Sequence, residues 1–211
     1  MKIVILGGTG YVGHGLMDIL STNTSLQLVS MSRSGGTQKD IIRWPSVTWL
    51  KIDLYDKQTW KAELQDADWV IDLIGILFAK NYSEYYSKTI DPVMNVIKYL
   101  EKENTTTKFL FVSANYAPPG MHNYMQAKKN LEKELSLRLG TRASFVYPGL
   151  IYHSDRPLVN ITGTSLALLQ KIPILKKVIS PLRPIARDRF ATEINQIITG
   201  NSSFLQQRTE K

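Results

Sequence analysis

Residues 2–13 of the chain read KIVILGGTGYVG, and this stretch decides the fold. Its first part, residues 2–6, is a short apolar run typical of a strand buried in a sheet. Beyond the glycines, residues 11–23 carry apolar side chains at helical spacing. A strand that turns through glycines directly into an amphipathic helix predicts the start of a βαβ unit. The stretch therefore predicts an α/β fold built on a parallel sheet.

The glycines permit two spacings, Gly8-x-Gly10-x-x-Gly13 and Gly7-x-x-Gly10-x-x-Gly13. Under either spacing, one glycine makes the tight turn, another lets the backbone approach a pyrophosphate, and the last lets the helix pack against the sheet. The phosphates would accept hydrogen bonds from the N–H groups at the helix start. This context predicts a dinucleotide site, and the alternative is a tight turn with a structural role only. The residues assigned to the site are Gly7, Gly8, Thr9, Gly10, Tyr11, Val12 and Gly13.

Strand and helix patterns alternate through the rest of the first 150 residues. Further strands are predicted over residues 26–32, 47–52, 69–74, 108–113 and 143–147, with helical patterns at 56–64, 91–103 and 123–139. This order predicts a doubly wound parallel sheet, the Rossmann fold, with residues 1–150 as its core. Residues 151–200, which four prolines divide into short pieces, are predicted to form a small lid on the substrate side of the same domain. Residues 201–211 are polar, and we expect a frayed tail.

Composition limits the classes of function. The chain has 211 residues and no cysteine, which excludes disulfides and thiolate zinc sites, and its three histidines show no metal-ligand spacing. It has no run of about 18 apolar residues and no recognisable signal segment, so we expect a cytoplasmic protein. No nucleic-acid-binding signature is found.

The formal net charge of +8 is uneven. Residues 1–120 hold 12 basic and 12 acidic residues, whereas residues 121–211 hold 14 and 6. The C-terminal excess favours an anionic ligand, a phosphate-bearing cofactor, an acidic partner or peripheral contact with an anionic membrane; the alternative is a solubilising surface. Apolar runs after residue 160 also suggest a pocket or lip with a basic rim, against the alternative of ordinary packing. The rim residues would be Lys176, Lys177, Arg183, Arg187 and Arg189.

The end of the second predicted strand bears on the choice of cofactor. An NAD site places Asp or Glu about 20 residues after the glycines to bind the ribose 2′-hydroxyl. This chain has Ser32, Arg33 and Ser34 there. A carboxylate would repel a 2′-phosphate, whereas a guanidinium and two hydroxyls can bind it. The sequence thus predicts NADP(H) as the preferred cofactor, with NAD(H) as the alternative. If Arg33 does not bind the cofactor, it is a solvated arginine at the end of a strand.

Two later strands end in residues that suit the same ligand. Asp53 and Leu54 follow the third strand, where a carboxylate would lie near the adenine amino group and an apolar side chain against the ring. Ile74 and Gly75 end the fourth strand, where a missing side chain would make room for the cofactor. An aspartate after a strand is, alternatively, a turn or cap residue.

Tyr124 and Lys128 stand four residues apart at the start of a predicted helix, which places phenol and ammonium on one face. Such a pair suits acid/base work, because a nearby positive charge lowers a phenol pKa toward neutrality. Ser113, which ends the fifth strand, is a candidate to hold the same substrate oxygen. Alternatively, Lys128 binds the cofactor ribose and takes no part in a reaction. Without the glycine turn, a tyrosine and a lysine at this spacing would be interpreted as two residues on the protein surface.

Taken together, these motifs resemble the extended and atypical short-chain dehydrogenase/reductases over nearly the whole chain. Local matches include Ser30–Gly35, Leu73–Leu77, Ser113–Asn115, Tyr147–Tyr152 and Leu182–Pro184. They are similar to the atypical branch that contains the NADPH-binding accessory subunit of respiratory complex I and a fungal coenzyme-Q-biosynthesis protein.

The resemblance implies functional roles for Ser113, Tyr124 and Lys128, and it places Tyr147, Pro148 and Gly149 near the nicotinamide. The family commonly has arginine where this chain has Tyr147, and the interval from Ser113 to Tyr124 is short. Several members of the branch bind the cofactor without a demonstrated reaction. Two functions are therefore expected. One is an NADPH-dependent reductase, dehydrogenase, epimerase or dehydratase. The other is a cofactor-binding sensor or assembly factor linked to quinone or respiratory metabolism.

Overall fold

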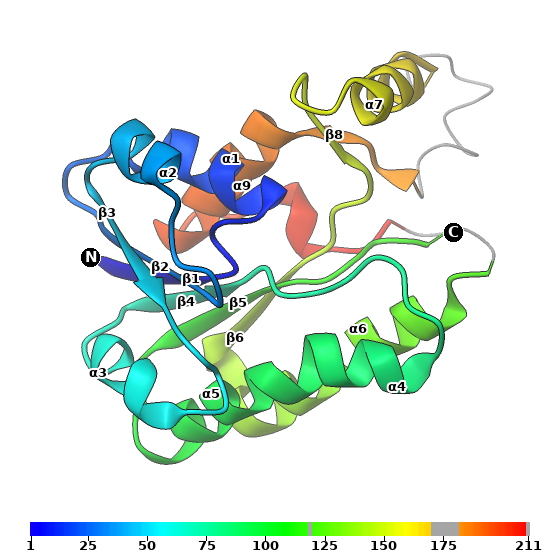
Figure 1. Cartoon of the computed structure of the whole chain (residues 1–211). Helices are drawn as coiled ribbons and strands as arrows, with labels where there is room; N and C mark the ends of the chain where they lie inside the picture. Colours follow the sequence, from blue (N-terminus) through cyan, green and yellow to red (C-terminus); the bar gives the residue numbers. More distant parts are fainter. Residues whose placement is uncertain (118–119, 170–181, 210–211) are drawn as a thin grey trace.

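A parallel six-stranded sheet with strand order β3-β2-β1-β4-β5-β6 forms the centre of the computed structural model (Figure 1). The structure describes residues 1–117, 120–169 and 182–209. Each strand lies within two residues of its predicted boundaries, so the doubly wound α/β fold is confirmed. The strands are β1 (Lys2–Leu6), β2 (Gln27–Ser32), β3 (Val47–Lys51), β4 (Trp69–Asp72), β5 (Lys108–Val112) and β6 (Ala143–Val146).

Helices cover both faces of this sheet (Figure 1). One face carries α1 (Tyr11–Leu20), α2 (Gln38–Arg43) and α9 (Arg187–Ile198). The other carries α3 (Lys61–Leu64), α4 (Tyr82–Tyr85), α5 (Asp91–Lys102) and α6 (His122–Leu139). Short helical turns lie at Lys57–Thr59, Gly140–Arg142 and Phe204–Gln206. Because both faces are covered, all five residues of β1 are buried, which explains the continuous apolar runs in the sequence.

Two features on the helical side were not predicted. Helix α2 is short, and its N-cap residue Thr37 forms a capping box with Asp40. Helix α5 was expected to begin after a loop. Instead, α4 continues into α5 through a π-helical turn at Tyr86–Ile90. That turn brings Thr89 toward the sheet, where it is buried.

The C-terminal part has its own small elements. β7 (Ile151–Tyr152) pairs with β8 (Ile185–Ala186) in a second, two-stranded sheet, and α7 (Pro157–Leu169) stands apart from the main sheet (Figure 1). Part of the predicted lid, including the expected rim residues Lys176 and Lys177, lies outside the described residues. The division into core and lid stays a prediction. Among the described residues, no helix combines the length and hydropathy needed to cross a membrane.

The tail differs from the expectation of a frayed end. Ser203 caps a helical turn through a capping box with Gln206, and Leu205 is fully buried in the core. The chain then continues in hydrogen-bonded contact with the sheet as far as Thr209. The prediction of fraying is wrong for residues 203–209, because apolar Leu205 and the capping box anchor the segment.

Candidate functional site

The centre of the sheet contains the point where the strand order reverses. β1 and β4 are neighbours there, and their crossover connections run in opposite directions, which opens a crevice at the carboxyl ends of the strands. Gly7 follows β1, and Ile74 and Gly75 follow β4. A side chain on Gly7 would lie 3.5 Å from Ile74 Cγ1, so these predicted cofactor residues from two strands do meet.

The glycines of the first turn have distinct reasons to be glycine. Gly7 has φ +82°, a conformation that other residues rarely adopt, and its N–H donates to Met31 O at 2.8 Å. A Cβ on Gly13 would overlap the carbonyl oxygen of Gly8, and one on Gly8 would overlap Ser30 Oγ. Gly10 is the N-cap of α1 and no side chain caps the helix. The N–H groups of the first turn are thus left for a ligand.

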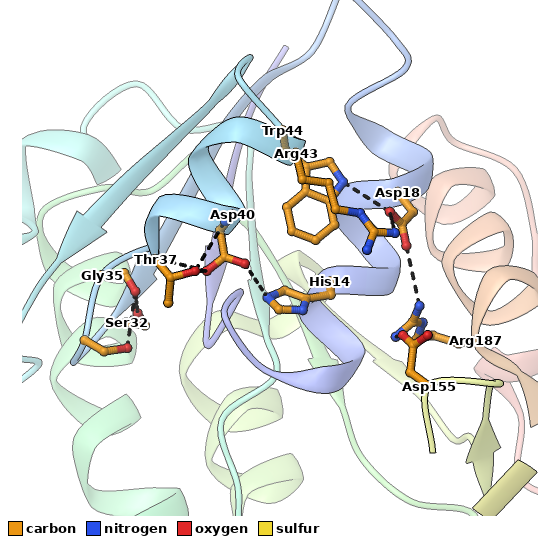
Figure 2. Close-up of polar contacts among 11 residues, drawn as sticks. His14, Asp18, Ser32, Gly35, Thr37, Asp40, Arg43, Trp44, Asp155 and Arg187 are labelled. Atoms are coloured by element: carbon orange, nitrogen blue, oxygen red, sulfur yellow. Dashed lines mark hydrogen bonds and ion pairs between the residues drawn. The ribbon is translucent and has the colours of Figure 1, made fainter. Parts of the chain in front are cut away.

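Polar contacts hold α1 on both flanks (Figure 2). His14 Nε2 lies 3.2 Å from Asp40 Oδ1 beside α2. Asp18 accepts from Arg43 at 2.8 Å and lies 3.5 Å from Arg187 Nη2 on the opposite side. These contacts fix the axis of the helix whose N-terminus faces the glycine turn.

Arg187 was expected on a basic rim, but only 2% of its surface is exposed. It packs against Gly15 and pairs with Asp155 at 2.7 Å, so it links α1 to the segment before α7. The guanidinium of Arg187 also lies 5.1 Å from the ring centre of Tyr11, and that of Arg156 lies 4.3 Å from it. The first residue of α1 therefore sits between two cations at the predicted phosphate site.

At the end of β2, the hydroxyl of Ser32 donates to Gly35 O at 3.3 Å (Figure 2). The hydroxyl of Ser34 donates to the same oxygen at 3.2 Å, and Arg33 is exposed. Both serine hydroxyls thus bond within the turn, and the Arg33 side chain is open to solvent. The contact of these three residues with a 2′-phosphate stays a prediction.

Asp53 and Leu54 have clear structural roles. Asp53 Oδ1 accepts from Tyr55 N at 2.9 Å, as in an Asx-turn, and Leu54 is 7% exposed and packs in the core. Their predicted contact with adenine stays a prediction.

Lys128 lies beside Gly75 and the end of β5. Its Nζ donates to Val112 O at 2.8 Å and stands 4.6 Å from the ring centre of Phe111. A Cβ on Gly75 would lie 3.5 Å from this Nζ, so the missing side chain leaves space directly beside the ammonium. Burial lowers the pKa of Lys128 to about 8, and the charges of Asp72 and Glu132 oppose that shift.

Asp72 is a member of this cluster that sequence reasoning missed. The carboxylate is fully buried at the end of β4, and Oδ1 accepts from Ile74 N at 2.9 Å. Oδ2 is buried without a hydrogen-bond partner among the described residues, as is Thr89 Oγ1. Burial raises the pKa of Asp72 to about 7, against the effects of the Ile74 N–H and of Lys128. A lone charge inside the apolar run of residues 69–74 was the signal available in the sequence.

Tyr124 lies one helical turn before Lys128 on α6, as predicted, with Lys128 Nζ 6.0 Å from its ring centre. Its ring packs edge-on against Tyr85. Burial raises the pKa of Tyr124 to about 12. The expected lowering of this pKa requires the positive nicotinamide ring beside Lys128, and it stays a prediction.

Ser113 is placed differently from the expectation. It is buried, and its hydroxyl donates to a carboxylate oxygen of Glu132, one turn beyond Lys128 on α6. Glu132 in turn pairs with Arg208 at 2.6 Å. In the described part of the chain, Ser113 Oγ is therefore directed to Glu132 and not to Tyr124. Neither Glu132 nor Arg208 was predicted, and the sequence carries no local signal that joins them.

Tyr147, Pro148 and Gly149 form a turn fastened to distant segments. Tyr147 O accepts from Arg183 Nη1 at 2.9 Å, and Pro148 O accepts from Asn115 N at 2.9 Å. A Cβ on Gly149 would overlap the backbone of Leu182. Arg183, another residue expected on the basic rim, thus donates its hydrogen bonds to backbone carbonyl oxygens. The proximity of this turn to a nicotinamide stays a prediction.

A family model described as the NAD dependent epimerase/dehydratase family matches residues 3–141. The chain belongs to this family. Solved structures share its fold at low sequence identity. A short chain dehydrogenase/reductase from Saccharomyces cerevisiae has a TM-score of 0.68 at 16% identity, over 98% of this chain and 94% of that one.

Two epimerases extend the comparison. A putative epimerase from Burkholderia cenocepacia has a TM-score of 0.67 at 16% identity, over 94% of this chain and 71% of that one. A UDP-glucuronic acid 4-epimerase from Bacillus cereus, solved with NAD, has a TM-score of 0.61 at 17% identity over 79% of this chain. The match covers 64% of that epimerase. At these identities the likeness concerns the fold alone.

Proposed function

We propose that the chain binds NADP(H) in the crevice between β1 and β4 and transfers hydride to or from a small carbonyl or hydroxyl compound. Epimerisation or dehydration with retained cofactor is a variant of the same chemistry. The observation that carries the proposal is the position of Lys128, whose buried ammonium stands beside the space left by Gly75. The glycine turn would hold the pyrophosphate, and Arg33 would pair with the 2′-phosphate.

The residues present fit such a cofactor. Gly8 and Gly13 bring α1 close to the sheet, and Gly75 leaves a cradle that a Cβ would narrow. When bound, the nicotinamide supplies or accepts the hydride. Lys128 would hold the ribose and contribute positive charge. Tyr124 would exchange one proton with the substrate oxygen, on the side where Lys128 balances the developing negative charge.

In the reducing direction, Tyr124 would act as the general acid. With a pKa raised by burial to about 12, the phenol holds its proton at neutral pH. Tyr124 would then donate that proton to a carbonyl oxygen as the carbon receives hydride. The resulting tyrosinate is stabilised by Lys128, whose Nζ lies 6.0 Å from the ring centre.

The test compares Tyr124→Phe with Tyr82→Phe, a control tyrosine whose hydroxyl only accepts from Asn130 at 2.6 Å. NADPH oxidation is followed with a panel of aldehydes, ketones and quinones, and NADPH affinity by calorimetry. We expect Tyr124→Phe to lose turnover by about 100-fold or more while NADPH affinity changes little. Full turnover in Tyr124→Phe would refute the assigned role.

The alternative, a cofactor-binding sensor or assembly factor without turnover, is favoured by one observation. The hydroxyl of Ser113, the expected carbonyl donor, is already donated to Glu132. The proposed kinship with the branch of the complex I accessory subunit supports the same alternative and its link to quinone or respiratory metabolism. NADPH binding with no turnover on the panel, in the wild-type protein, would favour it.

We also propose peripheral contact of α7 with anionic membrane. Leu158 and Ile161 lie one helical turn apart on α7 and are 82% and 64% exposed. Apolar side chains on a helix within a basic region are typical of interfacial helices. Co-sedimentation with anionic vesicles tests this contact, and Leu158→Ser together with Ile161→Ser should abolish it.

A further inference from the structure

Residues 203–209, which we call the strap, return to the carboxyl edge of the sheet. Leu205 O accepts from Tyr147 N at 2.8 Å and anchors the strap at the end of β6. Arg183 adds hydrogen bonds to Phe204 O at 3.1 Å and to Gln207 O at 2.7 Å. The strap is therefore held before it reaches the end of β5.

Two consecutive strap residues contact the segment that follows β5, bonding directly to Ala114 and Asn115 and reaching Ser113 through Glu132. Arg208 pairs with Glu132 through both nitrogens, at 2.6 and 3.1 Å, and Glu132 accepts from Ser113. Arg208 Nη2 also donates to Ala114 O at 3.4 Å. Thr209 N donates to Asn115 Oδ1 at 2.9 Å, and Asn115 Nδ2 donates to Thr209 Oγ1 at 2.7 Å.

The contacts continue from β5 to α6. Val112 O accepts from Lys128, and the next residue, Ser113, donates to Glu132, one turn further along α6. A shift of residues 113–115 would therefore move the carbonyl that orients the Lys128 ammonium. Bidentate, charge-assisted pairs such as Arg208 with Glu132 are among the strongest ways to fix such a position.

Arg208 also lies over Tyr147, with its guanidinium 4.2 Å from the ring centre. The resemblance leads one to expect an arginine at position 147. The strap places a guanidinium next to that position from a residue 61 places further along the chain.

We propose that Arg208 and Thr209 are positioning residues of the candidate active site, which is incomplete without the C-terminal strap. They act through Glu132 and the end of β5 on Lys128, and they do not touch the phosphate-binding half of the crevice. The expected effect on turnover rests on the proposed function. The expected effect on the position of residues 113–115 does not.

The experiment uses Arg208→Met in the full chain, with Arg138→Met as the matched control. Arg138 is also on the α6 side, is also 32% exposed at its side chain and also pairs with carboxylates, Glu101 and Glu134, but far from β5. Hydrogen exchange is measured at the amides of Ser113 and Asn115, which bond to Val146 O and Pro148 O. We expect exchange at these two amides to rise about tenfold or more in Arg208→Met only, with the amides of β1 unchanged.

Kinetics separate positioning from general destabilisation. In Arg208→Met we expect kcat to fall about tenfold or more while the KM for NADPH stays within about twofold, because geometry near the reacting atoms is lost and the phosphate site is intact. If Arg208→Met does not fold, Arg208→Lys keeps a cation without the second hydrogen bond, and an intermediate kcat is expected.

Unchanged exchange at Ser113 and Asn115 would overturn the inference. A raised kcat would also overturn it, because the strap would then obstruct the site. If the wild-type protein shows no turnover, the proposed function fails, and the exchange experiment still decides whether the strap fixes the end of β5.

Discussion

The ends of β1 and β5 lie at the same edge of the sheet and are built in opposite ways. At β1 the turn consists of glycines, backbone packs on backbone, and the helix start is left uncapped. At β5 the polar groups are met by side chains of α6 and of the strap. The first turn keeps room for a ligand, whereas the second is occupied by the protein itself. The comparison predicts that cofactor affinity and substrate-side geometry respond to different mutations.

The largest effect is expected at the first turn, for Gly13→Ala. A Cβ there would overlap the carbonyl oxygen of Gly8, and neither backbone can yield without moving α1 from the sheet. We expect the free energy of unfolding to fall by about 4 kcal/mol or more, and NADPH binding to be lost. Urea unfolding and calorimetry measure the two effects.

Gly10→Ala is the graded control for that change. Its φ is −80°, which alanine accepts, and the added Cβ would lie 3.2 Å from Gly7 O. We expect a loss of less than about 1 kcal/mol. Equal losses at positions 10 and 13 would show that close packing of α1 does not explain the glycine pattern.

The same comparison explains what the sequence could reveal. The first turn is local, since strand, glycines and helix follow within residues 2–20, and each glycine has a backbone reason visible in the pattern. The six strands were predictable because a doubly covered sheet requires continuous apolar runs. The surroundings of Ser113 were not predictable, because Asn115 and Thr209 are 94 positions apart and only the tertiary fold joins them. The burial that raises the pKa of Tyr124 was not predictable either, because the spacing to Lys128 does not reveal it.

An intermediate effect is expected at Asp72, at the end of β4, the strand that lies between β1 and β5. Its pKa in the folded chain, about 7, lies above the ordinary value of 3.8. Between these values the native state keeps a proton that the unfolded state has lost, so the free energy of unfolding falls as pH rises from about 4 to about 7. Asp72→Asn removes this dependence. We expect the variant to match the wild type near pH 4 and to be more stable by about 4 kcal/mol at pH 8.

Asp66→Asn provides a control of opposite sign. The pKa of Asp66 is lowered by its hydrogen bond to Lys2, so its contribution is present at neutral pH and is lost as pH falls through the folded pKa. Urea unfolding from pH 4 to pH 8 should therefore separate the two variants. A wild-type stability that does not fall between pH 4 and pH 7 would mean that Asp72 is not an uncompensated buried carboxylate.

The smallest effect is expected at the end of β2, where Arg33 is exposed and the hydroxyls of Ser32 and Ser34 bond within the turn. Arg33→Ser should weaken NADPH binding about tenfold, since one exposed charge-assisted contact is worth about 1–2 kcal/mol, and should leave NADH binding nearly unchanged. Calorimetric titration of both cofactors measures the difference, and added salt should reduce it. Arg33→Ser alters only the part of the site that would contact the adenosine ribose, and it leaves the end of β5 intact. The kcat at saturating NADPH should therefore equal that of the wild type. Wild-type NADH binding as tight as that of NADPH would remove the predicted preference and leave Arg33 as a solvated residue at a strand end.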